Sequence, residues 1–322
     1  MSMIQISKRQ KGTSKLVDVL IRIGAIVLSL IFIGIVLAIM GYDPFKVFGK
    51  IIQTPFKRFK DVMNKTIMLT TLSLGIAIAF RMKFWNIGAE GQFYMGAFGA
   101  ASMAFMCPDL PPILLLPLMC VAGFICGGLW ALIPAVIKAK FGASETLVTL
   151  MMNYIAIQLT SFFVTFWENS YGSNIVGTIN LESHKGWFPD VFGQMYGLNV
   201  IIVAVLAVAM YFYLKSTKHG FEIAVVGESH DTARYAAINV PAVTVRTVTL
   251  SGAVCGIAGF LAVAGQGHTI STNTAGGRGY VAIIVAWLAK FNTLVMILVS
   301  FLIVFLEMGA REIASKFNIS DN

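Results

Sequence analysis

Long apolar stretches recur along the whole chain, and they constrain its fold more than any other feature. Most are 15 to 25 residues long, about the length at which a helix crosses the roughly 30 Å hydrocarbon core of a bilayer. With 57% hydrophobic and 12% charged residues, the chain has more apolar surface than one soluble core can hide. We therefore predict an all-α fold, a polytopic helical membrane bundle with about nine hydrophobic segments. These segments lie at 16–40, 66–80, 91–107, 113–137, 146–167, 198–214, 247–267, 279–289 and 291–306.

The segment at 279–289 is too short to cross a bilayer alone. Its 11 residues give about 16 Å of helix. Two alternatives follow from this length. The segment is either a re-entrant half-helix that ends at Lys290, or it continues into 291–306 as one broken helix.

The distribution of basic residues predicts the topology. Lys and Arg are enriched in cytoplasmic loops, so we place the basic tail at 1–15 and the loop at 215–246 in the cytoplasm. The segment at 44–65 mixes lysines with phenylalanines on the outer side, and we interpret it as an amphipathic helix in the lipid interface. An inverted topology is the alternative. The remaining parts are a transmembrane domain over 16–310, an outer loop at 168–197 and a C-terminal tail at 311–322. The basic residues placed on the cytoplasmic side are Arg81, Lys83, Lys138, Lys140, Lys215, Lys218, Arg234 and Arg246.

A run of polar residues at 84–92 interrupts the apolar pattern. It holds a carboxylate, two amide side chains and two glycines. An unpaired polar group in lipid costs several kcal/mol, so such a segment normally lines a protein-enclosed or water-filled site. Transport is therefore the first hypothesis. The candidate substrate-pathway residues, chosen as hydrogen-bonding or flat aromatic groups, are Trp85, Asn86, Glu90, Gln92, Asn153 and Tyr154.

Four of these candidates also have a structural interpretation. Glu90 can pair with Arg81 or Lys83 and fix the fold. Asn153 can find its hydrogen-bond partner on a neighbouring helix. The two aromatic residues can lie at the membrane interface, where Trp and Tyr are common.

The motifs of several other protein classes are absent from the sequence. It has no GxxxxGK[ST] run, so we expect no P-loop, no catalytic residue and no cofactor bound by this chain. The four histidines and four cysteines show no ligand spacing, so we expect no metal site. We interpret the cysteines as small buried apolar residues. The net charge of +9 is scattered over short loops, which argues against nucleic acid as a partner.

The run Asn86-Ile87-Gly88-Ala89-Glu90-Gly91-Gln92 resembles the signature of ABC-importer permeases of the ribose and branched-chain amino acid group. It is most similar to the nucleoside and simple-sugar subfamily. The resemblance continues at 227–239, 251–259 and 279–286, and it covers roughly Thr66 to Gly309. Two departures lie in the loop at 215–246, called the inner loop below. Ser229-His230 stands where similar permeases often have Asn-Pro, and Ala237 stands where glycine is common.

The resemblance implies a permease subunit of an ATP-driven importer in the bacterial cell membrane, translocating nucleosides by alternating access. Simple sugars such as ribose are the alternative cargo, and branched-chain amino acids are a more distant one. The implied partners are a cytoplasmic ABC ATPase that uses ATP, a second related permease subunit, and an extracellular or periplasmic substrate-binding protein. The implied ATPase-coupling residues are Gly227, Glu228, Ala233, Arg234, Tyr235 and Asn239.

The C-terminus is unusual by the same comparison. Similar permeases close with a span that returns the chain to the cytoplasm, whereas nine crossings from a cytoplasmic start put the tail at 311–322 outside. We therefore expect that one last helix is missing from this sequence or that it uses one fewer span.

The sequence disfavours two rivals to an ATP-driven permease. An ion-coupled secondary carrier normally has carboxylates deep within its spans and inverted internal repeats, and neither is evident here. An intramembrane enzyme needs a nucleophile–base pair or a metal motif such as HExxH. The histidines offer neither.

Overall fold

The computed structural model describes residues 15–168, 176–191 and 196–317. Helices dominate these residues, and the strand-type pairing within them is an isolated bridge between Glu168 and Val176. The predicted all-α class is therefore confirmed. The chain forms two compact units, Arg58–Phe305 and a smaller unit made of Met1–Lys57 with Leu306–Asn322. Nearly all of the predicted tail at 1–15 lies outside the described residues.

The smaller unit contains α1 (Lys15–Ile39), α2 (Pro44–Lys57) and the last part of α12 (Thr293–Phe317). The side chain of Asp43 accepts hydrogen bonds from the backbone N–H groups of Phe45 and Lys46 at 3.0 and 3.3 Å. These bonds satisfy donors that the first turn of α2 leaves unpaired. Within this unit α12 packs closely on α2, since a Cβ on Gly309 would meet the backbone of Ile51.

The segment that we predicted as one interfacial helix at 44–65 is divided between two helices. α2 ends at Lys57, and α3 (Phe59–Arg81) begins after Arg58. α2 has the expected amphipathic character, because Lys46, Lys50 and Lys57 recur on one face of the helix and the apolar Phe45, Ile52 and Phe56 recur on another. Its location at a lipid interface stays a prediction.

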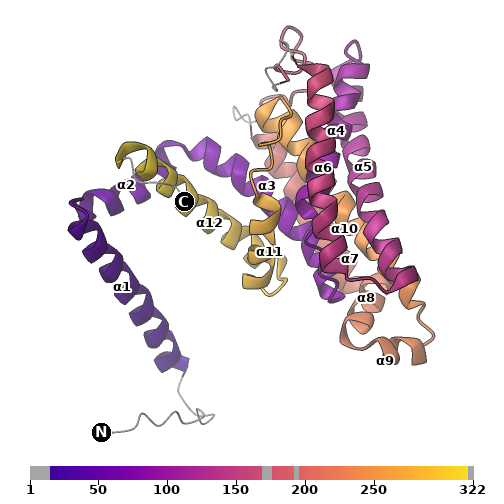
Figure 1. The fold of residues 1–322 in the computed structure, drawn as a ribbon, viewed down its shortest axis with the longest axis horizontal. Helices are drawn as coiled ribbons and strands as arrows, with labels where there is room; N and C mark the ends of the chain where they lie inside the picture. The colour runs from indigo at the N-terminus through magenta and orange to yellow at the C-terminus, as the bar shows by residue number, and fades with distance from the viewer. Residues whose placement is uncertain (1–14, 169–175, 192–195, 318–322) are drawn as a thin grey trace. The chain divides into compact units, whose positions relative to one another are not determined.

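The larger unit is a bundle built around α10. This helix packs along α3, α4 and α5, while α6 packs on α4 and α7 packs on α3. Figure 1 shows α4, α5, α6 and α10 running side by side. The bounds are α4 (Ala89–Met106), α5 (Pro112–Phe141), α6 (Glu145–Trp167), α7 (Gly197–Ser216) and α10 (Val240–Ala262).

Glycines bring the backbones of α4, α5 and α10 into contact. A Cβ on Gly96 of α4 would collide with the backbone of Gly256 in α10. A Cβ on Gly127 of α5 would meet Gly252 and Gly256. Small residues at helix crossings allow this close approach. The three helices therefore form the tightly packed centre of the unit.

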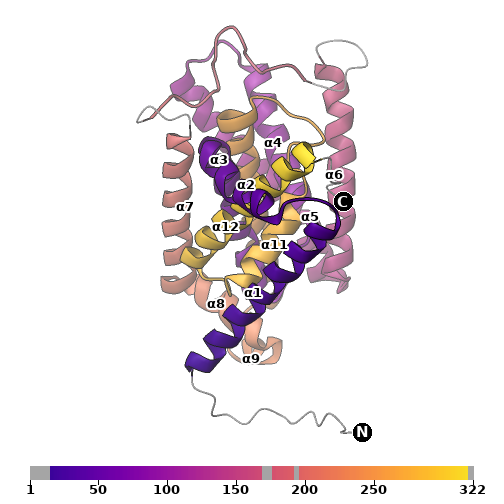
Figure 2. The ribbon, with the colours of Figure 1, turned by 90° about the vertical axis from the view of Figure 1, so that its left-hand side faces the viewer.

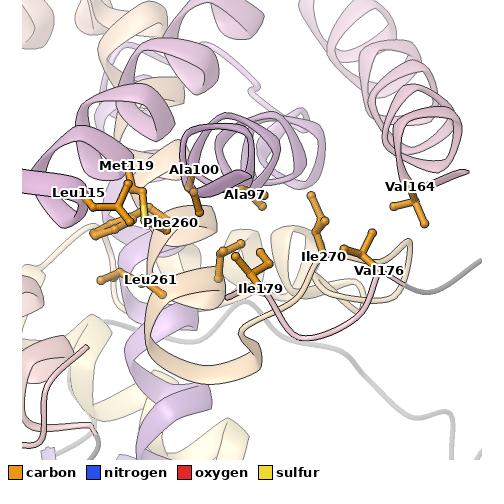
Figure 3. Packing of buried hydrophobic residues seen from close by; sticks show 14 of the residues in the cluster. Ala97, Ala100, Leu115, Met119, Val164, Val176, Ile179, Phe260, Leu261 and Ile270 are labelled. Carbon is orange, nitrogen blue, oxygen red and sulfur yellow. The ribbon is translucent and has the colours of Figure 1, made fainter. Parts of the chain in front are cut away.

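A buried hydrophobic cluster ties a loop to this centre. Figure 3 shows Leu115 of α5 near Phe260 of α10, and Val176 and Ile179 belong to the same cluster. The last two residues come from the predicted outer loop at 168–197, of which 169–175 and 192–195 lie outside the described residues. The described part of that loop is thus packed against the bundle.

Basic residues gather at the end of the unit that carries α8 (Lys218–Glu228) and α9 (His230–Tyr235). Figures 1 and 2 show these two short helices at the opposite end of the bundle from the loop between α6 and α7. Here Lys138 pairs with Glu145 at 2.5 Å, and Arg246 pairs with Glu222 at 2.7 Å. By the positive-inside rule we expect this end in the cytoplasm, and this placement stays a prediction.

Seven of the described helices are long and apolar enough to cross a membrane. Each predicted stretch is helical, but the predicted count of about nine segments is not confirmed by this measure, because α4 and α11 (Arg278–Leu288) fall outside it. α11 is the short helix expected at 279–289, and a turn with Lys290 and Phe291 at φ +48° and +59° separates it from α12. α12 continues to Phe317, so the predicted tail at 311–322 begins as helix, and 318–322 lie outside the described residues. The seven spans are Val19–Ile39, Phe59–Arg81, Pro112–Phe141, Glu145–Trp167, Gly197–Ser216, Val240–Gly265 and Thr293–Lys316.

Candidate functional site

The start of α4 is held by a reciprocal pair of buried amide side chains. Asn86 donates to Oε1 of Gln92 at 3.1 Å, and Gln92 donates to Oδ1 of Asn86 at 3.0 Å. The same Oδ1 accepts the N–H of Gly88 at 3.0 Å. Both side chains are almost fully buried. Their hydrogen bonds close the turn that leads into the helix, which explains why amides occur at this depth.

Ser251 links this turn to two further helices. Nδ2 of Asn86 donates to Oγ of Ser251 on α10 at 3.1 Å. The hydroxyl of Ser251 in turn donates to the carbonyl of Gly75 on α3 at 2.7 Å. The start of α4 is therefore fastened to both α10 and α3 through one serine.

Asn153 of α6 satisfies the backbone of the same turn. Its Oδ1 accepts the N–H of Gly91 at 2.8 Å, and its Nδ2 donates to the carbonyl of Ile87 at 2.8 Å. Nδ2 also lies 3.3 Å from the hydroxyl of Tyr280 on α11. A Cβ on Gly91 would come within 3.0 Å of Asn153, so glycine permits this approach. The amide finds its partners on a neighbouring segment, as its structural interpretation expected.

Glu90 is bound to the start of α11. Its two carboxylate oxygens accept the N–H groups of Gly277 and Gly279 at 2.9 and 2.6 Å. The partners proposed from the sequence, Arg81 and Lys83, were therefore wrong. The side chain is 3% exposed, and the positive end of the α11 dipole favours a carboxylate at this position.

The two aromatic candidates lie outside this hydrogen-bonded cluster. Trp85 is 44% exposed and stacks on Trp287, with ring centroids 5.3 Å apart. Tyr154 follows Asn153 on α6 but is 57% exposed. The structure thus brings Asn86, Glu90, Gln92 and Asn153 together and leaves both aromatic rings apart from them.

Several partners in this cluster were not singled out from the sequence. Ser251 and Gly279 begin the stretches 251–259 and 279–286 of the resemblance, and that was the available signal. Thr149 had none: it accepts the N–H of Ile87 at 3.2 Å from one helical turn before Asn153.

The predicted coupling residues divide into buried and exposed groups. Gly227 is buried, and a Cβ on it would collide with the carbonyl of Arg81 at the end of α3. Ala233 is also fully buried. By contrast, the side chain of Arg234 is 72% exposed and Tyr235 is 96% exposed. Arg234 and Tyr235 are therefore presented to solvent, whereas Gly227 and Ala233 are not.

The other two coupling residues lie at helix ends. Glu228 is the exposed last residue of α8, and Asn239 caps α10 by accepting the N–H of Ala242 at 3.1 Å. Ala237, just before this cap, adopts φ +56°. A left-handed backbone is costly for alanine and free for glycine. This explains why glycine is common here in the permeases that the sequence resembles.

Glu222 holds α8 against α10. It accepts a hydrogen bond from Arg246 at 2.7 Å, and this bond lowers the pKa of Glu222 from its ordinary value. His219 lies 3.5 Å from the same carboxylate oxygen. The ion pair between Glu222 and Arg246 therefore connects the α8–α9 segment to α10.

Known proteins are similar to this chain over most of its length. The guanosine ABC transporter permease protein NupP of Bacillus subtilis is 29% identical, over 92% of this chain and 86% of its own. The glucose ABC transporter permease protein TsgB13 of Haloferax volcanii is 27% identical, over 89% and 78%. The nucleoside ABC transporter permease protein NupB of Lactococcus lactis is 25% identical, over 91% and 84%. No solved structure matches the chain.

Residues 59–319 match the family described as branched-chain amino acid transport system / permease component. This range includes the α4 turn, α8–α9, α10 and α11. The resemblance stated from these sequence motifs is therefore confirmed. The helices that can cross a bilayer agree with a multi-pass protein of the cell membrane. This chain belongs to that family of ABC transporter permeases.

Proposed function

We propose that this chain translocates nucleosides as the permease subunit of an ATP-driven importer. The observation that carries the proposal is its similarity to permeases named for guanosine and for nucleosides, over 92% and 91% of the chain. A permease named for glucose is similar over 89%, so a simple sugar is the second candidate. A ring with free hydroxyl groups is common to both kinds of cargo.

The proposed importer needs three further components. A cytoplasmic ATPase hydrolyses ATP, because this chain has no P-loop. A second, related permease subunit completes the pathway. An extracellular or periplasmic binding protein delivers the cargo.

The α8–α9 segment is the proposed docking point of the ATPase. Arg234 and Tyr235 project from it at the basic end. A guanidinium supports charge-assisted hydrogen bonds, and an exposed tyrosine offers a flat apolar face with a polar tip. These two side chains form the proposed contact surface.

Contacts behind this surface support a route for movement. The bond between Glu222 and Arg246 joins α8 to α10. Further along α10, Ser251 joins that helix to Asn86 at the start of α4. These two contacts connect the α8–α9 segment through α10 to the run 86–92 at the start of α4. A displacement of α9 by the ATPase can thus reach that run, as alternating access requires.

Uptake measurements test the cargo. This chain and its partner subunits are expressed in cells that lack their own nucleoside uptake, and labelled guanosine, uridine, ribose and leucine are compared. We expect accumulation of a nucleoside and competition by unlabelled nucleosides. Accumulation of ribose or leucine without any nucleoside contradicts the cargo proposal.

The energy source separates the proposal from an ion-coupled carrier. In the same cells, we expect uptake to stop when the P-loop lysine of the partner ATPase is replaced. A protonophore, applied while ATP is kept constant, should leave the initial rate unchanged. Uptake that persists with the inactive ATPase and stops with the protonophore favours the carrier.

A further inference from the structure

A cavity of about 330 Å³ lies beside the start of α11. It is lined by Met68 of α3, by Thr269, Ser271 and Thr274 of the segment that precedes α11, and by Arg278. Small-molecule sites are typically cavities of a few hundred Å³ with a small number of convergent polar groups. This cavity has the size and the polar lining for one small ligand.

The polar groups of the cavity suit an uncharged ligand rich in hydroxyls. Ser271 and Thr274 place their hydroxyl oxygens 3.2 Å apart, and each hydroxyl can both donate and accept. Nη1 of Arg278 is directed at the sulfur of Met68 at 3.4 Å. A thioether is a weak acceptor, so a ligand oxygen at this place would form the stronger hydrogen bond.

Glu90 fixes the backbone on both sides of Arg278. Its carboxylate binds the N–H of Gly277 before the arginine and the N–H of Gly279 after it. A Cβ on Gly279 would collide with the backbone of Glu90, so α11 begins in direct contact with α4. One carboxylate beside one guanidinium also leaves little net charge, which disfavours an anionic ligand.

Tyr94 holds the same segment at a second point. It lies one turn after Glu90 on α4, and its hydroxyl donates to the carbonyl of Thr272. Two side chains on one face of α4 thereby shape the wall of the cavity. The position of the guanidinium depends on α4 rather than on α11 alone.

We propose that this cavity binds the sugar ring of the cargo, with Arg278 and the hydroxyls of Thr269, Ser271 and Thr274 hydrogen-bonding to the ring hydroxyls. Glu90 is a positioning residue for Arg278. The proposal rests on the proposed function and adds which part of the cargo the permease reads. It also explains how one scaffold serves nucleosides and simple sugars, since their ring hydroxyls are the shared feature.

Selectivity for ring hydroxyls tests the proposal. In the uptake cells, the initial uptake rate of a ribonucleoside is divided by that of its 2′,3′-dideoxy analogue. This selectivity ratio is compared between variants. The binding protein is the same throughout, so a change in the ratio belongs to the permease. We expect Arg278→Gln to lower the ratio about tenfold, because a hydrogen bond to a charged group is lost. Ser271→Ala should lower it several-fold.

A matched control removes an arginine outside the cavity. Arg58 is exposed and pairs with Asp61 at 2.8 Å before the first turn of α3. Arg58→Gln makes the same chemical change and should leave the ratio as in the unchanged chain. Equal ratios for Arg278→Gln, Arg58→Gln and the unchanged chain, at equal membrane levels, overturn the proposal.

The positioning role has its own readout. Glu90→Gln keeps one carbonyl acceptor but turns an NH₂ group toward the second backbone N–H. We expect it to lower the ratio as Arg278→Gln does, and the double variant to lower it no further. Additive losses would mean that Glu90 acts independently of Arg278.

A labelling measurement covers the case in which Arg278→Gln does not reach the membrane. Ser271→Cys places a thiol in the cavity, and its reaction with a small charged thiol reagent is followed, with the unsubstituted chain as background. Guanosine should slow the labelling, and an unchanged rate overturns the proposal. If the unchanged chain imports glucose and no nucleoside, the cargo proposal fails alone, and the cavity is tested with 2-deoxyglucose in the same variants.

Discussion

Oε2 of Glu90 accepts the backbone N–H of Gly279 at 2.6 Å, which joins the first turn of α4 to the first turn of α11. The carboxylate of Glu90 thus already binds backbone N–H groups of its own chain. Its burial is compensated by hydrogen bonds and by the α11 dipole, as a carboxylate in an apolar setting requires. The polar motif therefore joins α4 to α11, and its predicted role in the substrate pathway stays a prediction.

Replacement of Asn153 should destabilise the protein strongly. Asn153→Leu leaves the N–H of Gly91 and the carbonyl of Ile87 buried without their partner, at about 1–3 kcal/mol for each group. We expect a loss of about 3 kcal/mol in the free energy of unfolding, measured by thermal unfolding in detergent. Tyr154→Leu is the matched control, because Tyr154 is adjacent and 57% exposed. A similar loss in both variants contradicts the specific role of Asn153.

Charge reversal at Arg234 should uncouple transport from ATP. The ion pair of Arg234 with Asp231 is long, at 3.8 Å, and exposed, so Arg234→Glu should change stability little. We expect uptake to fall at least about tenfold, because the charge reversal opposes the proposed ATPase contact. Lys140→Glu reverses an exposed cation in the last turn of α5, outside the α8–α9 segment, and should retain uptake. If the ATPase still assembles and uptake is unchanged in Arg234→Glu, the docking assignment is wrong.

The attachment of α8 should depend on pH. The hydrogen bond from Arg246 lowers the pKa of Glu222 below its ordinary value of 4.5. A carboxyl with a lowered folded-state pKa stabilises the fold above its unfolded pKa, and this contribution is lost as pH falls through the folded-state pKa. We expect the amides of α8 to lose hydrogen-exchange protection below about pH 4.5.

Two variants check this pH dependence. Glu222→Gln should abolish the pH-dependent loss of protection in α8. Glu228→Gln removes an exposed carboxylate from the end of the same helix and should preserve it. A pH profile that survives in Glu222→Gln would assign the effect to another group.

Ala237→Gly should stabilise the inner loop. Alanine at φ +56° carries a backbone strain of roughly 1–2 kcal/mol that glycine does not have. Glycine also makes the unfolded chain more flexible, and this offsets part of the gain in stability. We expect a net gain of about 0.5–1 kcal/mol, seen as slower hydrogen exchange in α9. Ala236→Gly is the adjacent control at φ −78°, and it should destabilise. Destabilisation by both variants would contradict the backbone argument.

The helices were predictable from the sequence because lipid leaves few choices for the backbone. A segment such as 146–167 must satisfy its N–H and C=O groups internally, so apolar length alone indicates a helix. The boundary at Arg58 was not predictable, because the lysines and aromatic residues of 44–65 continue through it. The break depends on local backbone geometry that residue type does not specify.

The site was predictable in part. The depth of Asn86, Glu90, Gln92 and Asn153 showed that each needed a partner, and the structure supplies one for each. The identity of the partners was not predictable, since Gly277 is 187 positions from Glu90 along the chain. Trp and Tyr occur both at membrane interfaces and in substrate pathways, so the sequence alone could not decide which role Trp85 and Tyr154 have.

The glycine contacts among α4, α5 and α10 determine which parts of the bundle can shift. Where Gly96 and Gly127 meet Gly256, backbone touches backbone, and there are no rotamers to exchange. These three helices therefore shift only together, as one rigid body. A displacement that reaches α10 must move α4 and α5 with it.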